Sequence, residues 1–238
     1  MLEFGVRPSR EESLSLIDEA FDEINDTFWL SPQATKPVKD EFIERYSEDT
    51  RHYHGVSHLG ELIIFANQFI PVSGLKVVRA NLFGMIIGHD SIQEPGVPDP
   101  ENVAKSRELT VEKFSYIGVP QPDVLHMAAG VEATANHDTS IRDDTIAFFL
   151  DDDMAIVGTP EERYDQYADD IAKEYSWVKP FELFLKTRKE YVLDEFLARD
   201  RIFNTDFVHK LLNTQARINM RRESARLGLR LSQLKASS

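Results

Sequence analysis

Apolar positions recur along most of the chain with the period of an α-helix. In residues 13–30, the side chains of Leu14, Ile17, Phe21 and Ile24 fall on one helical face and carboxylates on the opposite face. The same period recurs in three later segments, at residues 160–178, 181–200 and 206–234. Alternating patterns typical of β-strands are scarce. The sequence therefore predicts an all-α fold with about eight to ten helices.

Proline, glycine and polar residues mark the predicted ends of the helices. In residues 99–118, Asp99 suits an N-cap, Pro100 the first turn and Gly118 the stop after the last turn. Four short loop-like stretches separate the helical segments, at residues 31–37, 71–74, 91–100 and 118–122. The sequence has no internal repeat and no low-complexity linker. We therefore expect residues 1–238 to form a single domain.

Composition and charge narrow the classes of function. Of the 238 residues, 42% are hydrophobic and 29% are charged, which is typical of a folded protein. The 41 acidic residues outnumber the 27 lysines and arginines, and the net charge of −14 disfavours nucleic acid as a partner. The chain has no cysteine, which excludes disulfides and zinc–thiolate sites. Without a signal-peptide pattern or an apolar run of membrane-spanning length, we expect a cytoplasmic protein with no membrane partner.

Histidine is concentrated in one short stretch. Three of the seven histidines, His52, His54 and His58, lie in the segment RHYHGVSHLGEL. If this segment starts a helix, His54 and His58 are separated by about 40° around its axis and face the same side. Two histidines at this spacing form half of a metal site in many proteins, but for an isolated pair two exposed polar side chains are the more frequent explanation. The pair alone does not decide between the two hypotheses.

Two further segments carry candidate ligands. His89 and Asp90 end a strongly apolar stretch. Both can bind one ion only if that ion lies at the end of the helix. Alternatively, His89 caps the helix and Asp90 starts a turn. Residues 151–153 are three aspartates inside an apolar segment. A bound cation would compensate the cost of burying such carboxylates, and the alternative is an acidic helix N-terminus.

The order of these segments resembles a known superfamily. The chain is helical and carries first a histidine, then the pair His89–Asp90, and then an aspartate. This order resembles that of the HD superfamily of metal-dependent phosphohydrolases. The segment RHYHGVSHL resembles the YHNxxH motif of cyclic-nucleotide phosphodiesterases in that superfamily. The likeness to one bacterial family of predicted HD phosphohydrolases extends from Phe42 to Glu223. It includes the segments ERYSEDTRHYHGVSHL, GHDS, EATANHD, FLDDDMAIVG, YDQYADDIAKEY, FLKTRKEYVLDEFLARDRIFNT and ARINMRRE.

The resemblance implies a helical bundle of the HD type with additional C-terminal helices, and a metal centre within it. The implied ligands of the cation are His58, His89, Asp90 and Asp151. The family motif D-x-D leaves position 152 variable and makes Asp153 the alternate ligand or a residue supporting the ligands. The cofactor is one or two divalent ions per chain, of manganese, iron, cobalt, nickel, zinc or magnesium.

The resemblance also implies roles in catalysis. The metal ligand Asp90 takes part in activating water, and His54 stands where the phosphodiesterase-type enzymes have the proton donor to the leaving oxygen. Arg51 is either a contact to substrate phosphate or a solvated surface residue. His137 contacts phosphate, helps to hold a second metal, or is a polar residue near a helix end. The remaining histidines, His52, His126 and His209, are predicted to be structural or exposed.

The expected function is hydrolysis of a phosphate ester of a small molecule, with a nucleotide as the leading candidate. Two alternatives share the fold: a catalytically weak nucleotide-binding sensor, and a di-iron oxygenase that would need His126 and His137 as additional ligands. The chain departs from the family pattern at Gly55, Val103 and Ala172, positions expected to shape the substrate pocket. Homo-oligomerisation stays open.

Overall fold

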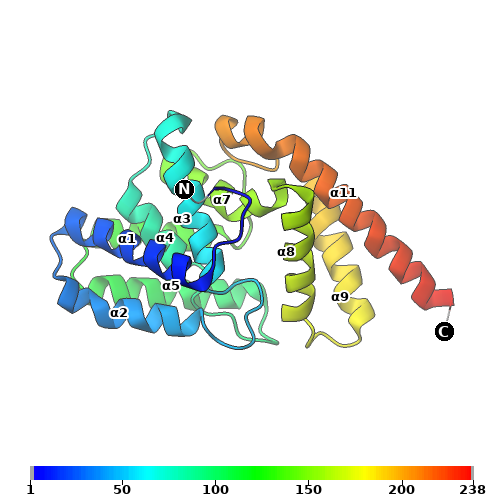
Figure 1. The fold of residues 1–238 in the computed structure, drawn as a ribbon, viewed down its shortest axis with the longest axis horizontal. Helices are drawn as coiled ribbons and strands as arrows, with labels where there is room; N and C mark the ends of the chain where they lie inside the picture. Colours follow the sequence, from blue (N-terminus) through cyan, green and yellow to red (C-terminus); the bar gives the residue numbers. More distant parts are fainter. Residues whose placement is uncertain (1–2, 237–238) are drawn as a thin grey trace.

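The computed structural model describes residues 3–236, and all regular structure in this part of the chain is helical (Figure 1). The prediction of an all-α fold is confirmed. The first seven helices are α1 (Arg10–Phe28), α2 (Pro32–Arg45), α3 (Val56–Ser73), α4 (Arg79–Gly88), α5 (Asp99–Tyr116), α6 (Gln121–Ala133) and α7 (Asp144–Asp153). They are followed by the 3₁₀-helix η1 (Met154–Gly158), α8 (Glu161–Glu174), α9 (Phe181–Thr187), the π-helix η2 (Arg188–Leu193), α10 (Asp194–Ala198) and α11 (Asp206–Ala236).

Side-chain caps mark the starts of α1 and α7. Before α1, the Ser9 hydroxyl accepts a hydrogen bond from the Glu12 N–H, and the Glu12 carboxylate accepts one from the Ser9 N–H. Before α7, the Asp143 carboxylate accepts hydrogen bonds from the backbone N–H groups of Thr145 and Ile146. The backbone N–H groups at these helix starts therefore have partners, and α7 begins at a defined residue.

Two of the predicted loops belong to helices. Residues 31–37 were expected to be a loop, but α2 starts at Pro32 and contains Pro37. Proline suits the first helical position, where no intrahelical hydrogen bond is required, and within the helix it costs one hydrogen bond. Residues 71–74 are mostly the last turn of α3, which ends before Gly74 in the left-handed conformation. Proline and glycine there mark the end of a helix and not a separate loop.

Helix α4 is the most completely buried helix leading to the site. All its residues from Ala80 to Gly88 are buried. At its end, α5 approaches so closely that a Cβ atom on Gly88 would lie 2.2 Å from the Thr110 hydroxyl oxygen. Only glycine permits this distance between the two helices. The close packing places the residues that follow α4 in the interior of the protein.

The remaining helices surround this centre in two groups (Figure 1). Helices α1, α2 and α5 lie in one half of the molecule, α8, α9 and α11 in the other half, and α7 between them. One cluster of buried apolar side chains extends from Leu16 in α1 to Leu227 in α11. Asn219 joins α11 to η1, because its Nδ2 donates to the carbonyl oxygens of Val157 at 2.9 Å and Thr159 at 2.8 Å. None of the described helices combines the length and the apolar character needed to cross a lipid bilayer.

A buried polar network holds the C-terminal helices together. The Arg188 guanidinium, in η2, donates to both carboxylate oxygens of Glu223 in α11, at 3.1 and 3.3 Å. The Tyr164 hydroxyl, in α8, donates to the same carboxylate. The Arg188 guanidinium also lies over the Tyr167 ring, with its central carbon 5.1 Å from the ring centre. This distance is within the range of a cation–π interaction. This network fixes the position of α8, whose last residue contributes to the site.

Candidate metal centre

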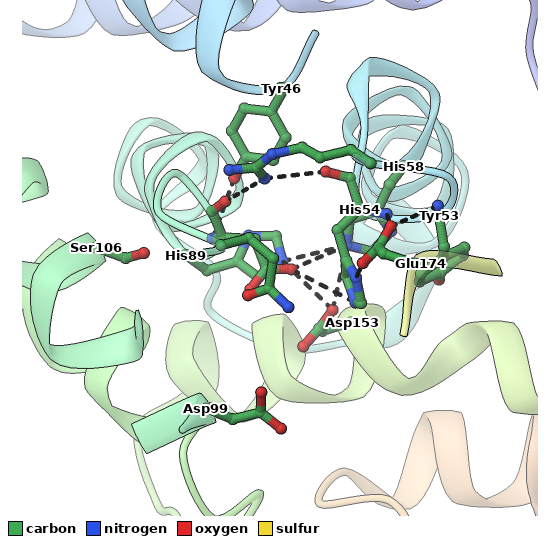
Figure 2. Close-up of polar contacts among 12 residues, drawn as sticks. Tyr46, Tyr53, His54, His58, His89, Asp99, Ser106, Asp153 and Glu174 are labelled. Atoms are coloured by element: carbon green, nitrogen blue, oxygen red, sulfur yellow. Dashed lines mark hydrogen bonds and ion pairs between the residues drawn. The ribbon is translucent and has the colours of Figure 1, made fainter. Parts of the chain in front are cut away.

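Four side chains from the ends of three helices meet at the centre of the protein (Figure 2). His58 lies in the first turn of α3, His89 and Asp90 directly follow α4, and Asp153 is the last residue of α7. The two histidine side chains are almost fully buried, whereas the side chains of Asp90 and Asp153 remain 19% and 16% exposed. The cluster therefore has a buried imidazole side and a carboxylate side that solvent can reach.

The donor atoms of the cluster lie close to a common point. The Nε2 atoms of His58 and His89 are 3.2 Å apart, and Asp90 Oδ2 is 3.1 Å from His89 Nε2 and 3.9 Å from His58 Nε2. Asp153 Oδ1 is 3.5 Å from both Nε2 atoms. Donor atoms that bind one cation at about 2.1 Å are separated by about 3.0–3.4 Å in octahedral or tetrahedral geometry. His58, His89 and Asp90 therefore form a group that could hold a divalent cation, and Asp153 Oδ1 lies beside both imidazoles of this group.

The hydrogen bond on the far side of the His89 ring supports this fit. His89 Nδ1 lies 2.8 Å from the Ile86 carbonyl oxygen, which can only accept, so Nδ1 carries the hydrogen and donates it. When the ring is neutral, its Nε2 atom offers a lone pair toward His58 and the carboxylates. Metal-binding histidines usually have such a second hydrogen bond, which fixes both the tautomer and the ring orientation.

Electrostatics favour positive charge at the cluster. Burial alone would raise the pKa of the Asp90 and Asp153 carboxyls, but the neighbouring histidines, chiefly His89, together hold both pKa values below their ordinary range. Burial alone would lower the pKa of His89, but the surrounding acidic groups, chiefly Asp90, together raise it. For His58, burial dominates and lowers the pKa, which leaves a neutral ring. Two carboxylates thus stabilise a cationic group at this point, as they would a metal ion.

The three consecutive aspartates of residues 151–153 lie in three different environments. Asp153 faces the histidines, whereas the Asp151 carboxylate accepts hydrogen bonds from the N–H groups of Asn204 and Thr205 and from the Thr205 hydroxyl. Successive helical residues point about 100° apart, so only one of the three can face the cluster. The structure therefore places Asp153, the predicted alternate, beside the histidines, whereas the predicted ligand Asp151 is bonded to the residues that precede α11.

His54 lies beside the cluster, in the turn that precedes α3. It was expected on the face of the same helix as His58, but α3 begins only at Val56, with Gly55 as its N-cap. His54 Nε2 is 3.9 Å from Asp90 Oδ2, and its Nδ1–H donates to Glu174 Oε1 at the end of α8. Because it precedes the helix, His54 can bond to Glu174 while His58 faces the cluster.

Glu174 fixes the orientation and the charge of His54. Its second oxygen accepts hydrogen bonds from the N–H groups of Tyr53 and His54, at 2.8 and 3.1 Å. Burial lowers the pKa of His54, but the carboxylates of Glu174 and Asp90 outweigh it and raise the pKa to about 9. For Glu174, burial alone would raise the pKa, but the charge of His54 and the hydrogen bonds from Tyr53 and His54 together lower it to about 2. At neutral pH the structure therefore holds a protonated imidazole next to the cluster.

Arg51 connects the two histidine segments and does not face the open side of the cluster. Its Nη1 donates to the carbonyl oxygens of His54 at 3.0 Å and Asp90 at 2.6 Å, and its Nη2 donates to that of Ser91 at 3.2 Å. The guanidinium also lies 5.0 Å from the centre of the Tyr46 ring, and its side chain is 1% exposed. The predicted contact to substrate phosphate is therefore replaced by a structural role: Arg51 holds His54 and Asp90 in position.

His137 joins the site from the loop after α6. Its Nε2 is 3.4 Å from Asp153 Oδ2, on the oxygen that does not face His58 and His89. The backbone of His137 has a φ of 44°, a conformation that few residues other than glycine adopt, and Arg199 Nη1 donates to its carbonyl oxygen at 2.8 Å. Burial lowers the pKa of His137, so its ring is neutral. The structure thus brings this predicted residue to the cluster.

The other histidines lie away from the cluster. The His126 ring lies 2.8 Å from Asn81 Nδ2 and 3.1 Å from Asp143 Oδ1, and so connects α6 to the start of α7. His209 lies in α11, and His52 is an exposed residue of the turn before α3.

Several residues that shape the site carry no local sequence signal. Glu174 is 120 positions away from His54, and its only sequence cue is its place in the segment IAKEY. The Tyr46 hydroxyl accepts a hydrogen bond from the Asp90 N–H at 3.1 Å. The Tyr53 ring packs at 4.8 Å against both His54 and His58. These contacts depend on the packing of α2, α3 and α8, which no short motif encodes.

We compared the chain with protein-family models, curated proteins and solved structures, and nothing matches. The case for a function therefore depends on the geometry of the cluster, together with the resemblance of its sequence segments. Both concern the same few residues, so substitutions at these residues are the direct test.

The assignment of the aspartate ligand can be tested with two substitutions. We expect Asp153→Asn to weaken Mn²⁺ binding by about 100-fold or more, because a charged partner is lost from a buried cluster. Asp151→Asn should change Mn²⁺ affinity by no more than about threefold and lower the free energy of unfolding by about 1.5–3 kcal/mol, the usual contribution of hydrogen bonds to a carboxylate. Calorimetric titration with Mn²⁺ and urea unfolding of both variants measure these effects. A larger loss of affinity in Asp151→Asn would restore Asp151 as the ligand.

Proposed function

We propose that the protein is a metal-dependent phosphohydrolase that cleaves a phosphate ester of a small molecule, a nucleotide. The observation that carries the proposal is a protonated imidazole beside a group suited to a cation: His54 lies 3.9 Å from Asp90, whose carboxylate belongs to the cluster with His58 and His89. Ester hydrolysis requires both parts, a cation near the phosphoryl oxygens and an acid for the leaving oxygen. The resemblance to the HD superfamily supports the same function.

In this proposal the ion is held by two imidazoles and two carboxylates, from His58, His89, Asp90 and Asp153. A bound divalent cation supplies positive charge to the phosphoryl group and lowers the pKa of water enough to provide hydroxide near neutral pH. Asp90 and Asp153 are the partly exposed members, so substrate approaches from their side of the cluster. The buried histidines are shielded from solvent on the opposite side.

His54 is proposed to protonate the leaving oxygen from Nε2. Its Nδ1–H donates to Glu174, which orients the ring and compensates the imidazolium charge. When Nε2 gives up its proton, the neutral ring keeps the Nδ1–H donor, so the bond to Glu174 persists throughout. Arg51 maintains the distance between His54 and Asp90 by binding the carbonyl oxygens of both residues.

A cleft next to Glu174 supports a nucleoside as the leaving group. Asp99, Tyr175 and Trp177 line it, the Tyr175 hydroxyl donates to Asp99 at 3.4 Å, and the Trp177 ring is 42% exposed. A carboxylate and an exposed indole can bind ribose hydroxyls and a base. Among residues 3–236, the only cationic residue lining this cleft is Arg51, whose guanidinium binds backbone carbonyls. The cleft therefore favours a monophosphate over a substrate with further phosphates.

Two roles stay open for His137. Its neutral ring beside Asp153 Oδ2 would suit a second divalent ion, for which these two residues supply one nitrogen and one oxygen. Alternatively, its ring binds a phosphoryl oxygen of the substrate. The number of ions bound per chain separates these roles.

The structure lends less support to the two alternative functions. A di-iron oxygenase would need both His126 and His137 near the cluster, but His126 is bonded to Asn81 and Asp143. A sensor without turnover would not need a charged acid, yet His54 is held in its protonated form by Glu174. The phosphohydrolase accounts for all of these residues.

The role of His54 can be tested with two kinds of leaving group. With Mn²⁺ bound, the wild type should release phosphate from a nucleoside 5′-monophosphate and from p-nitrophenyl phosphate. His54→Gln should retain the metal and lose about 10²–10⁴-fold in kcat on the nucleotide, the usual contribution of a positioned acid. The loss on p-nitrophenyl phosphate should be much smaller, because p-nitrophenolate leaves without a proton. Metal analysis and phosphate release measure these effects.

The exposed His52, two positions away, provides the matched control. His52→Gln should behave as the wild type on both substrates. Equal losses on both substrates in His54→Gln, or loss of its metal, would contradict the role of His54 as the acid. Two irons per chain with oxygen consumption would favour the oxygenase, and nucleotide binding without phosphate release would favour the sensor.

The pH dependence tests the contribution of Glu174. His54 is protonated below its pKa of about 9, so the rate on a nucleoside monophosphate should fall as the pH rises through that value. Glu174→Gln removes the carboxylate that contributes most to raising this pKa, so the fall should occur at lower pH. The measurement is kcat as a function of pH for the wild type, Glu174→Gln and the exposed control Glu162→Gln. An unchanged alkaline limb in Glu174→Gln would show that another group sets it.

A further inference from the structure

A small cavity lies beside His58, between α3 and the end of α7. Its volume is about 20 Å³, enough for one water molecule. The side chains of His58, Asp152 and Thr159 line it, together with residues of the N-terminal segment 3–6. The cavity thus adjoins the proposed metal ligand on one side and the middle aspartate of residues 151–153 on the other.

Two of the lining side chains have polar atoms without a partner. His58 Nδ1 and both carboxyl oxygens of Asp152 make no hydrogen bond to any of residues 3–236. Both residues are buried, at 1% and 2% exposure. Buried polar groups in proteins nearly always have a hydrogen-bond partner, in the protein or as ordered water. Unpartnered atoms on two side chains that line one water-sized cavity indicate a shared partner.

The far side of His58 needs such a partner for a physical reason. Its Nε2 faces His89 at 3.2 Å and Asp153 at 3.5 Å, and can offer a lone pair there only if the ring hydrogen is on Nδ1. His89 satisfies the same requirement through the Ile86 carbonyl oxygen. For His58, no backbone carbonyl plays this role, and Asp152 supplies the unpartnered acceptor atoms in the adjoining cavity.

We propose that one water molecule in this cavity accepts the hydrogen of His58 Nδ1 and donates to the carboxyl group of Asp152. Asp152 is then a positioning residue, which fixes the tautomer and the orientation of His58 through this water. The inference relies on the metal centre of the proposed function, but not on phosphate hydrolysis. It assigns a role to the one aspartate of residues 151–153 that neither binds α11 nor faces the cluster.

The N-terminal segment 3–6 lines one side of the cavity. The Phe4 ring packs edge-on against Phe65 at 5.1 Å and Phe69 at 5.8 Å, and the Phe4 N–H donates to Gln68 Oε1 at 3.1 Å. In Figure 1 this segment crosses in front of α3 and α7 before α1 begins. Residues 3–6 thus form one wall of the cavity beside His58.

The test compares two substitutions of Asp152 in the full-length protein. Asp152→Asn keeps a carbonyl oxygen as acceptor, whereas Asp152→Leu has a similar volume and no acceptor. We expect Asp152→Leu to weaken Zn²⁺ binding by about 10–100-fold, the usual effect of removing the hydrogen-bond partner of a metal-bound histidine, and Asp152→Asn to weaken it by no more than about threefold. Competition titration with a chelator measures the affinities, and Asp169→Leu, at an exposed aspartate, is the control.

A second measurement needs no metal and no variant at Asp152. In the metal-free wild type at neutral to alkaline pH, ¹⁵N chemical shifts of the imidazoles should show His58 with its hydrogen on Nδ1, with the signal assigned by its absence in His58→Gln. Either of two results would overturn the proposal: a hydrogen on Nε2 of His58, or an unchanged Zn²⁺ affinity in Asp152→Leu. The position of the hydrogen is measured in the wild type, so it decides the question even if Asp152→Leu does not fold. Failure to release phosphate would contradict the proposed function and leave these two results standing.

Discussion

The rest of the site depends on one constraint: three donor atoms lie close together in the interior. The Nε2 atoms of His58 and His89 are 3.2 Å apart, and Asp153 Oδ1 is 3.5 Å from both. Lone pairs and carboxylate charges repel one another at such distances unless positive charge lies between them. The protein therefore has to hold His58, His89 and Asp153 rigidly and to supply that charge, as a proton or as a cation. The packing of α3, α4 and α7 serves the first requirement.

Rigidity comes from backbone contacts made by charged side chains. Arg51 binds the carbonyl oxygens of His54 and Asp90, and Asp151 binds the turn that precedes α11. Both are buried charges without a solvent role, and both connect segments far apart in the sequence. The cost of burying them is offset by several hydrogen bonds to each, which is the condition for burying a charge. Charge in this protein thus shapes the backbone around the cluster as well as the cluster itself.

The sequence predicts the helical class, and which histidines and acidic segments come together, better than it predicts which individual side chains face one another. A period of 3.6 residues identifies α1, α5, α8 and α11, because each buries one face against the core. Within residues 151–153, Asp153 lies beside the histidines and Asp151 does not, because three adjacent aspartates look alike until the helix axis is known. Glu174 could not be found from the sequence, since its contact with His54 spans 120 positions and depends on how α8 packs. Arg51 was assigned to phosphate because its carbonyl partners are invisible in a sequence.

The different environments of His54 and His58 follow from where α3 begins. Had the helix started before His54, both rings would face one side and compete for the same ion. Instead Gly55 is the N-cap and the chain before it turns, so Glu174 can accept hydrogen bonds from both the ring and the N–H of His54. The carboxylate that charges His54 thereby keeps its Nδ1 occupied, while Nε2 stays 3.9 Å from Asp90. A shift of the helix start by two residues would convert an acid into a ligand, which makes the short turn before α3 as important to the proposed chemistry as the ligands themselves.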